Sequence, residues 1–85
     1  MKYRSRIDII SLILETANGG EVTKTNIMYK AYLGYAQLKE YLTILTENNL
    51  ISYNELTQTF RTTEKGLRFI NIYNQLGDVL KASSQ

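Results

Sequence analysis

The sequence predicts a mostly α-helical protein with one small β-hairpin, arranged as a winged helix-turn-helix with a long C-terminal helix. Three observations predict this fold class. Two helical segments are separated by a few residues that include a glycine, two short strand-like segments follow, and a long segment of helical periodicity ends the chain. A chain of 85 residues has room for one hydrophobic core, so we expect a single domain over residues 1–85.

The first helix is expected to begin after Ser5. Asp8 follows three residues later, a spacing in which the serine hydroxyl bonds backbone N–H groups and the acid lies near the positive end of the helix. Apolar residues then recur every three or four positions as far as Asn18, Gly19 and Gly20, residue types that end helices. Residues 21–23 are expected to form a short extended piece.

Two further helices are expected over residues 24–32 and 35–48. The first of them starts after Thr23 or Thr25, and the tight break between the two contains Gly34. The second carries an apolar stripe at positions i, i+3, i+4 and i+7, which predicts one buried face. That stripe consists of Leu38, Tyr41, Leu42 and Leu45.

Residues 50–53 and 59–62 read as the two strands of the hairpin, and Thr63 is expected to cap a last helix that runs from Glu64 to about residue 82. The last helix is apolar on more than one side. One stripe is expected to pack on the first helix and the other on a second subunit of a homodimer, although a single broad core face within a monomer also fits. The predicted dimer interface is Leu67, Ile70, Tyr73, Asn74, Gly77 and Leu80.

The composition argues against catalysis. The chain has neither cysteine nor histidine, its eight carboxylates are scattered, and no glycine-rich phosphate loop is present. We therefore expect no enzyme activity, no metal, no cofactor and no small-molecule ligand. No apolar run is long enough to cross a bilayer, so a cytoplasmic location is expected. Because the net charge is only +2, a basic surface requires clustering of the cations.

Residues 23–76 carry a more specific resemblance. The runs Thr-Lys-Thr-Asn-Ile-Met-Tyr (23–29), Gln-Leu-Lys-Glu-Tyr-Leu (37–42) and Thr-Thr-Glu-Lys-Gly-Leu (62–67) resemble those of archaeal winged-helix DNA-binding proteins. This group comprises the ten-kilodalton chromatin proteins and related small transcription regulators. The resemblance implies binding of double-stranded DNA in transcription regulation or chromosome organisation, hence association with the nucleoid. It also implies dimerisation through the last helix as an antiparallel coiled coil.

The third expected helix, over residues 35–48, is the recognition helix of this arrangement. A recognition helix enters the major groove by its N-terminal part. There, Gln37 can bond an adenine edge and Lys39 a guanine or a phosphate, whereas Glu40 repels phosphate. Outside the recognition helix, the N-terminus of another helix and exposed cations can bind phosphates. The candidate DNA contacts are Tyr35, Ala36, Gln37 and Lys39 in the recognition helix, Lys24, Thr25 and Asn26 before it, Arg61 in the wing, and Arg4 and Arg6 in the N-terminal arm.

The alternative hypothesis is a protein-interaction module without significant DNA binding. A clustered positive surface along the third helix and the wing would favour DNA, and an apolar groove there would favour a protein partner. Several tyrosines also invite a base-stacking interpretation, but packing in the core or an interface is the expectation. These tyrosines are Tyr29, Tyr32, Tyr41, Tyr53 and Tyr73.

Overall fold

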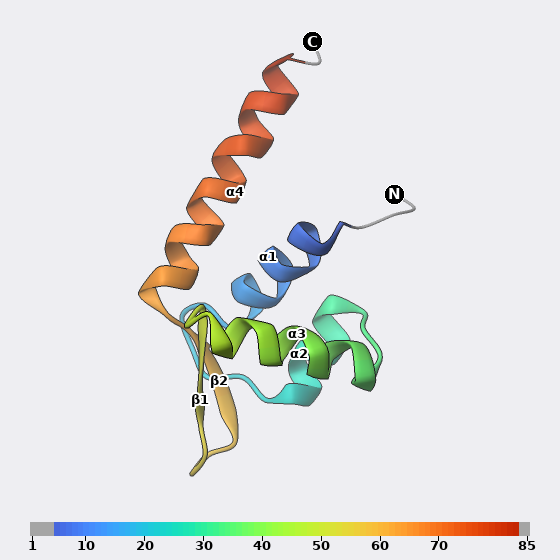
Figure 1. Ribbon diagram of the computed structural model, residues 1–85, viewed down its shortest axis with the longest axis vertical. Helices are drawn as coiled ribbons and strands as arrows, with labels where there is room; N and C mark the ends of the chain where they lie inside the picture. Colours follow the sequence, from blue (N-terminus) through green and yellow to red (C-terminus); the bar gives the residue numbers. More distant parts are fainter. Residues whose placement is uncertain (1–4, 84–85) are drawn as a thin grey trace.

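The predicted fold class is confirmed by a computed structural model, which describes residues 5–83 and the side chains of residues 5–79. Three helices are followed by a two-stranded hairpin and a long fourth helix (Figure 1). The elements are α1 (Arg6–Thr16), α2 (Lys24–Ala31), α3 (Tyr35–Glu47), β1 (Ile51–Asn54), β2 (Thr59–Thr62) and α4 (Glu64–Ser83). Each boundary lies within two residues of the expected one.

Local capping fixes where the helices begin. Ser5 and Asp8 form a reciprocal capping box at the start of α1, as the spacing predicted. At α2 the cap is Thr23 rather than Thr25, because the Thr23 hydroxyl accepts a hydrogen bond from the Asn26 backbone N–H at 3.2 Å. The Thr63 hydroxyl caps α4 by accepting from the Gly66 N–H at 3.0 Å.

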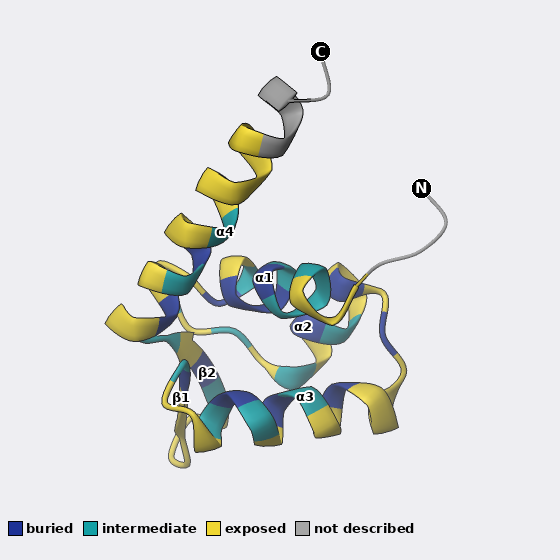
Figure 2. Cartoon of the chain, turned by 45° about the horizontal axis from the view of Figure 1, so that its top comes forward, coloured by how far each residue is buried: buried dark blue, intermediate teal, exposed yellow. Residues whose placement is uncertain are grey.

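One hydrophobic core lies between the first three helices, the hairpin and the first half of α4 (Figure 2). The stripe expected on α3 forms part of it, with Tyr41 only half-buried at its edge. The buried apolar residues are Ile13, Leu14, Ala17, Ile27, Ala31, Leu33, Leu38, Leu42, Leu45, Ile51, Phe60 and Ile70. Burial of each large side chain among them stabilises the fold by about 1.5–3 kcal/mol.

The hairpin is fixed to the helices on two sides. β1 and β2 pair antiparallel with Ile51 opposite Thr62, and the extended piece expected at residues 21–23 adds a bridge, because Val22 exchanges two backbone hydrogen bonds with Phe60. Thr62 reaches α1, where its hydroxyl donates to the Leu14 carbonyl at 2.6 Å. The wing therefore has a defined position relative to α3.

α4 begins against the core and then extends away from it (Figure 1). The start of α4 passes close to the backbone of Leu50, because a Cβ on Gly66 would lie 2.2 Å from the Leu50 carbonyl oxygen. Further along, the Tyr73 hydroxyl donates a hydrogen bond to Asp8 at the start of α1. No helix in residues 5–83 is long and apolar enough to span a membrane.

Tyr29 and Tyr32 do not pack in the core, one of the two places expected for the tyrosines. Their side chains are 75% and 82% exposed. Ile27 and Ala31 already occupy the buried face of α2, so Tyr29 points outward, and Tyr32 follows the last residue of the helix in a left-handed backbone conformation.

Candidate nucleic-acid interface

A groove of about 490 Å³ runs between α3 and the wing. Its floor is apolar: Leu42 and Phe60 are buried, and the Tyr53 ring packs on Phe60 with the centroids 4.7 Å apart. Lys24 and Lys39 bring two positive charges to the groove. The complete lining is Lys24, Lys39, Leu42, Thr43, Thr46, Tyr53 and Phe60.

Lys24 is held in place by an aromatic ring. Its ammonium nitrogen lies 5.2 Å from the centroid of the Tyr35 ring, a distance at which the ring quadrupole attracts a cation. Among the described residues, neither Lys24 nor Lys39 is paired with a carboxylate. The structure therefore brings three predicted DNA contacts, Lys24, Tyr35 and Lys39, to one side of α3. The charges of the two lysines are not compensated by a carboxylate of the described residues.

A second hollow, of about 370 Å³, joins the start of α2 to the tip of the wing. Lys24 and Thr25 line it from α2, and Thr57 and Gln58 line it from the wing. The tip is ordered by Asn54, whose side-chain oxygen accepts from the Leu56 N–H at 2.9 Å. Thr25, a predicted phosphate contact, thus lines the same hollow as Lys24.

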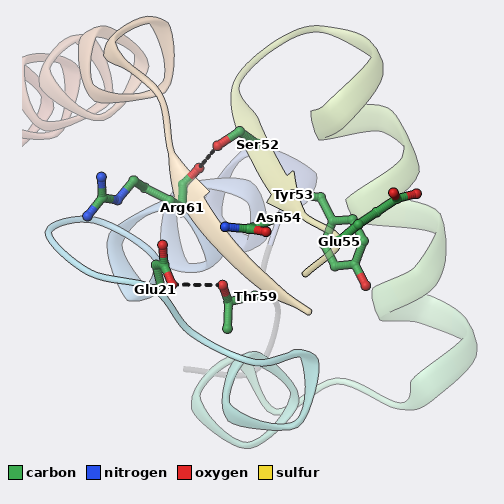
Figure 3. Close-up of a pocket in the computed structure, with 7 residues that line it drawn as sticks. All are labelled: Glu21, Ser52, Tyr53, Asn54, Glu55, Thr59 and Arg61. Carbon is green, nitrogen blue, oxygen red and sulfur yellow. Dashed lines mark hydrogen bonds between the residues drawn. The ribbon is translucent and has the colours of Figure 1, made fainter. Parts of the chain in front are cut away.

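Arg61 lies on the opposite face of the wing (Figure 3). Because residues alternate along a strand, the buried Phe60 turns toward α3 and Arg61 turns away from it. Arg61 lines a separate hollow of about 640 Å³ together with Glu21 and Glu55. Glu21 accepts a hydrogen bond from the Thr59 hydroxyl at 3.1 Å. The predicted wing contact is therefore not part of the lysine groove, and carboxylates share its surroundings.

Two predicted base or phosphate contacts are engaged in capping. The Gln37 side-chain oxygen accepts from the Gly34 N–H at 3.4 Å, and that of Asn26 accepts from the Thr23 hydroxyl at 2.7 Å. A bidentate contact to adenine uses both the oxygen and the NH2 group of an amide. Gln37 can offer both only by giving up its long bond to Gly34, whereas its NH2 group remains available as a donor.

The remaining candidate DNA contacts among the described residues do not line the groove. Ala36 and Glu40 are exposed, and at helical spacing they share the outward ridge, where the carboxylate opposes phosphate. Arg6 lies over the Tyr41 ring at 5.5 Å from its centroid, on the flank of α3 away from the wing. Arg4 lies outside the described residues.

Five groove residues were not among the predicted DNA contacts: the buried Leu42 and Phe60, and also Thr43, Thr46 and Tyr53. Thr43 and Thr46 follow Lys39 at i+4 and i+7, so helical spacing places all three on one flank of α3. That spacing was available in the sequence. Tyr53 was expected to pack in the core or an interface, but it is 46% exposed and forms one wall of the groove.

On α4 the predicted interface residues divide between two environments. Ile70 is buried in the core of the same chain, at 5% exposure, and Tyr73 bonds Asp8, so these two face the domain itself. The others are exposed, except that the Leu80 side chain lies outside the described part. A different apolar set, Ile72, Leu76 and Val79, is 58–60% exposed at spacings of four and three.

The contact between α4 and α1 shifts two pKa values. The hydrogen bond from Tyr73, together with those from Ser5, lowers the pKa of Asp8, because each favours the ionised carboxylate. The same bond raises the pKa of Tyr73, because ionisation would remove the donated proton. Asp8 thus serves both the α1 cap and the attachment of α4.

Comparison with known proteins agrees with the winged-helix fold. A family model described as winged helix-turn-helix matches residues 3–81. The chain belongs to this family. The winged helix-turn-helix chain is 30% identical over 79 residues to the uncharacterized protein MJ0287 of Methanocaldococcus jannaschii, covering 93% of this chain and 79% of that protein.

A solved structure shares the fold. It is the crystal structure of Sso10a-2, a DNA-binding protein from Sulfolobus solfataricus, which superimposes with a TM-score of 0.77 at 20% sequence identity. The match covers 95% of the winged helix-turn-helix chain and 90% of Sso10a-2. Both similar proteins come from archaea, in line with the group that the sequence motifs resemble.

Proposed function

We propose that this chain binds double-stranded DNA through α3, the start of α2 and the groove-facing side of the wing. The observation that carries the proposal is the pair of uncompensated lysines, Lys24 and Lys39, along the groove beside the recognition helix. One phosphodiester strand fits this arrangement, with phosphates at the lysines and deoxyribose on the apolar floor. The DNA-binding description of Sso10a-2, which shares the fold, supports it.

The role is non-enzymatic, in transcription regulation or chromosome organisation at the nucleoid. Among the described residues no group of three or more Asp, Glu, His or Cys side chains could hold a metal, and the full sequence supplies no histidine or cysteine. The lysine contacts are with phosphates, which all sequences share. Ala36 and the NH2 group of Gln37, at the start of α3, are the positions from which base edges are read.

Binding to one 20-base-pair duplex tests the assignment of the face. Lys24→Ala and Lys39→Ala should each weaken the affinity about three- to tenfold, because each removes a charge that meets a phosphate. Arg68→Ala is the matched control, since Arg68 is an exposed cation on α4, away from the groove. Equal affinity of all three variants and the unchanged chain would show that DNA does not occupy this groove.

We further propose that the chain forms a homodimer through α4. Phe69, Ile72, Leu76 and Val79 recur at spacings of three, four and three, the repeat of a coiled-coil seam. The last three are exposed in the single chain, so a second α4 would remove this stripe from water. The proposed seam therefore differs from the originally predicted set by using the stripe that the domain leaves uncovered.

Sedimentation equilibrium distinguishes the two stripes. Leu76→Asp should produce a monomer, because a carboxylate within the seam is costly to desolvate. Leu67→Asp, on the same helix but off the seam, should leave the dimer intact. A dimer that survives Leu76→Asp and dissociates with Leu67→Asp would restore the interface first predicted from the sequence.

The apolar floor of the groove favours a second candidate function, a protein-interaction module. Leu42, Tyr53 and Phe60 form the kind of surface that packs against a partner side chain. The two functions differ in one measurable respect. Absence of duplex binding even at about 50 mM salt, where phosphate contacts are strongest, would favour the protein partner.

A further inference from the structure

One continuous part of the chain has no carboxylate. Residues 22–39 contain three lysines, Lys24, Lys30 and Lys39, and neither Asp nor Glu. This segment comprises α2, the turn after it and the start of α3. All eight acids of the chain lie outside it, so its lysines present their charge without an acidic neighbour in the segment. Such a surface attracts a polyanion.

The same segment carries three exposed aromatic rings. Tyr29, Tyr32 and Tyr35 are 75%, 82% and 56% exposed. They lie within seven residues of one another, from the last turn of α2 to the first residue of α3. An aromatic ring in water forgoes the burial that normally stabilises a fold, so three of them close together indicate a surface that a partner covers.

Tyr32 adds backbone strain to this exposure. Its φ and ψ are 55° and 48°, the left-handed conformation that suits glycine at a helix end and costs a side chain with a Cβ. Tyr32 therefore combines a left-handed backbone with a ring that is 82% exposed. Strain retained at an exposed position is typical of a residue kept for binding.

From the alternation of cations and exposed rings we infer that residues 22–39 form a site for single-stranded DNA, in which unpaired bases stack on Tyr29 and Tyr32 while Lys24, Lys30 and Lys39 meet the phosphates. Stacking on aromatic side chains combined with a positive surface is the common chemistry of single-strand binding. A duplex keeps its base faces stacked internally and offers none to these rings. The site extends the proposed duplex face, with which it shares Lys24 and Lys39, beyond the end of α2.

The test compares two labelled strands with equal numbers of phosphates by fluorescence anisotropy: a 15-nucleotide oligo-dT and a 15-nucleotide abasic strand. The full chain should bind oligo-dT at least tenfold more tightly, because only this strand has bases to stack. The double variant Tyr29→Ala/Tyr32→Gly should lose at least tenfold in affinity for oligo-dT and bind the abasic strand unchanged.

Two controls separate loss of the site from loss of the fold or of duplex binding. Tyr32→Gly relieves the left-handed strain, so the double variant should unfold at a temperature no lower than that of the unchanged chain. Its affinity for a 20-base-pair duplex should stay within twofold, since Tyr29 and Tyr32 lie outside the proposed duplex face.

Equal affinity for oligo-dT and the abasic strand, or a double variant that still binds oligo-dT fully, would overturn the inference. So would the absence of binding to either strand, which would leave the tyrosines as a surface for a protein. The duplex proposal is tested by a separate measurement, the affinity of Lys39→Ala for the 20-base-pair duplex, and it fails if that affinity equals that of the unchanged chain.

Discussion

Replacing Gly66 by alanine tests how closely the start of α4 passes Leu50, the residue before β1. The added Cβ would lie 2.2 Å from the Leu50 carbonyl oxygen and 2.7 Å from the Thr62 methyl carbon, both closer than atoms can approach. The Leu50 carbonyl accepts the Thr63 N–H at 3.1 Å, so it cannot move without losing that bond.

Three contributions set the size of the effect. Overpacking costs about 1–3 kcal/mol, and the lost hydrogen bond costs about 1 kcal/mol. The higher helix propensity of alanine returns about 1 kcal/mol. Gly66→Ala should therefore lower the free energy of unfolding by about 2 kcal/mol, which lowers the midpoint of thermal unfolding by about 8–16 °C in a domain of this size.

Gly77→Ala is the matched control on the same helix. A Cβ there meets no atom within 4 Å, so only the propensity gain of about 0.5–1 kcal/mol remains, and the midpoint should rise. Circular dichroism at 222 nm follows both variants. A Gly66→Ala protein as stable as the Gly77→Ala protein would refute the close crossing of α4 over Leu50.

Three further changes have defined outcomes. Thr63→Ala should lower the free energy of unfolding by about 1–2 kcal/mol in a urea titration, because it removes the α4 cap and the bond to the Asn49 carbonyl. Tyr32→Gly should raise that free energy by up to about 1 kcal/mol in the same titration, since it relieves a left-handed backbone. Tyr73→Phe should raise the pKa of Asp8 toward its ordinary value, as followed by NMR of the carboxyl carbon during a pH titration.

The Tyr73–Asp8 bond also predicts how stability depends on pH. A carboxyl whose pKa is lowered in the fold stabilises it above the unfolded pKa of about 4, and this stabilisation is lost as the pH falls through the folded pKa. A tyrosine whose pKa is raised stabilises the fold below about pH 10, and this is lost as the pH rises through the folded value. Tyr73→Phe should weaken the acid dependence and remove the alkaline one. Unchanged profiles would show that α4 is not attached to α1 through this bond.

The fold was predictable because its signals are local. The hydroxyls of Ser5 and Thr63 cap helices within three residues of their own positions, and the helical stripe of α3 is visible in the sequence alone. Where two residues had the same local chemistry, the sequence left the choice open. In the structure Thr23 has the extended backbone of a cap residue, with φ −86° and ψ 163°, whereas Thr25 lies inside α2.

The site was less predictable because it depends on packing between elements. Arg61 is a cation in the wing, but its side chain lies on the face away from α3. Phe60 faces α3, and residues alternate along the strand, so the next residue faces the other way. On α4 two apolar stripes have the same three-and-four spacing. Only the docking of α4 on α1 decides that Ile70 is buried and Ile72 is exposed. Gln37 was predicted as an adenine contact, but its side-chain oxygen accepts the Gly34 N–H, a bond that no pattern in the sequence indicated.

The salt dependence of duplex binding tests the central claim most directly. Between about 50 and 200 mM salt, the logarithm of the affinity of the unchanged chain should fall linearly with the logarithm of the salt concentration. A slope of about −4 to −5 is expected if about four to six cations meet phosphates. In the double variant Lys24→Ala/Lys39→Ala the slope should become shallower by about 2 for each bound chain, and so by about 4 for the proposed homodimer, whereas Arg68→Ala should leave it unchanged. A slope that the double variant does not alter would contradict the placement of a DNA strand between α3 and the wing.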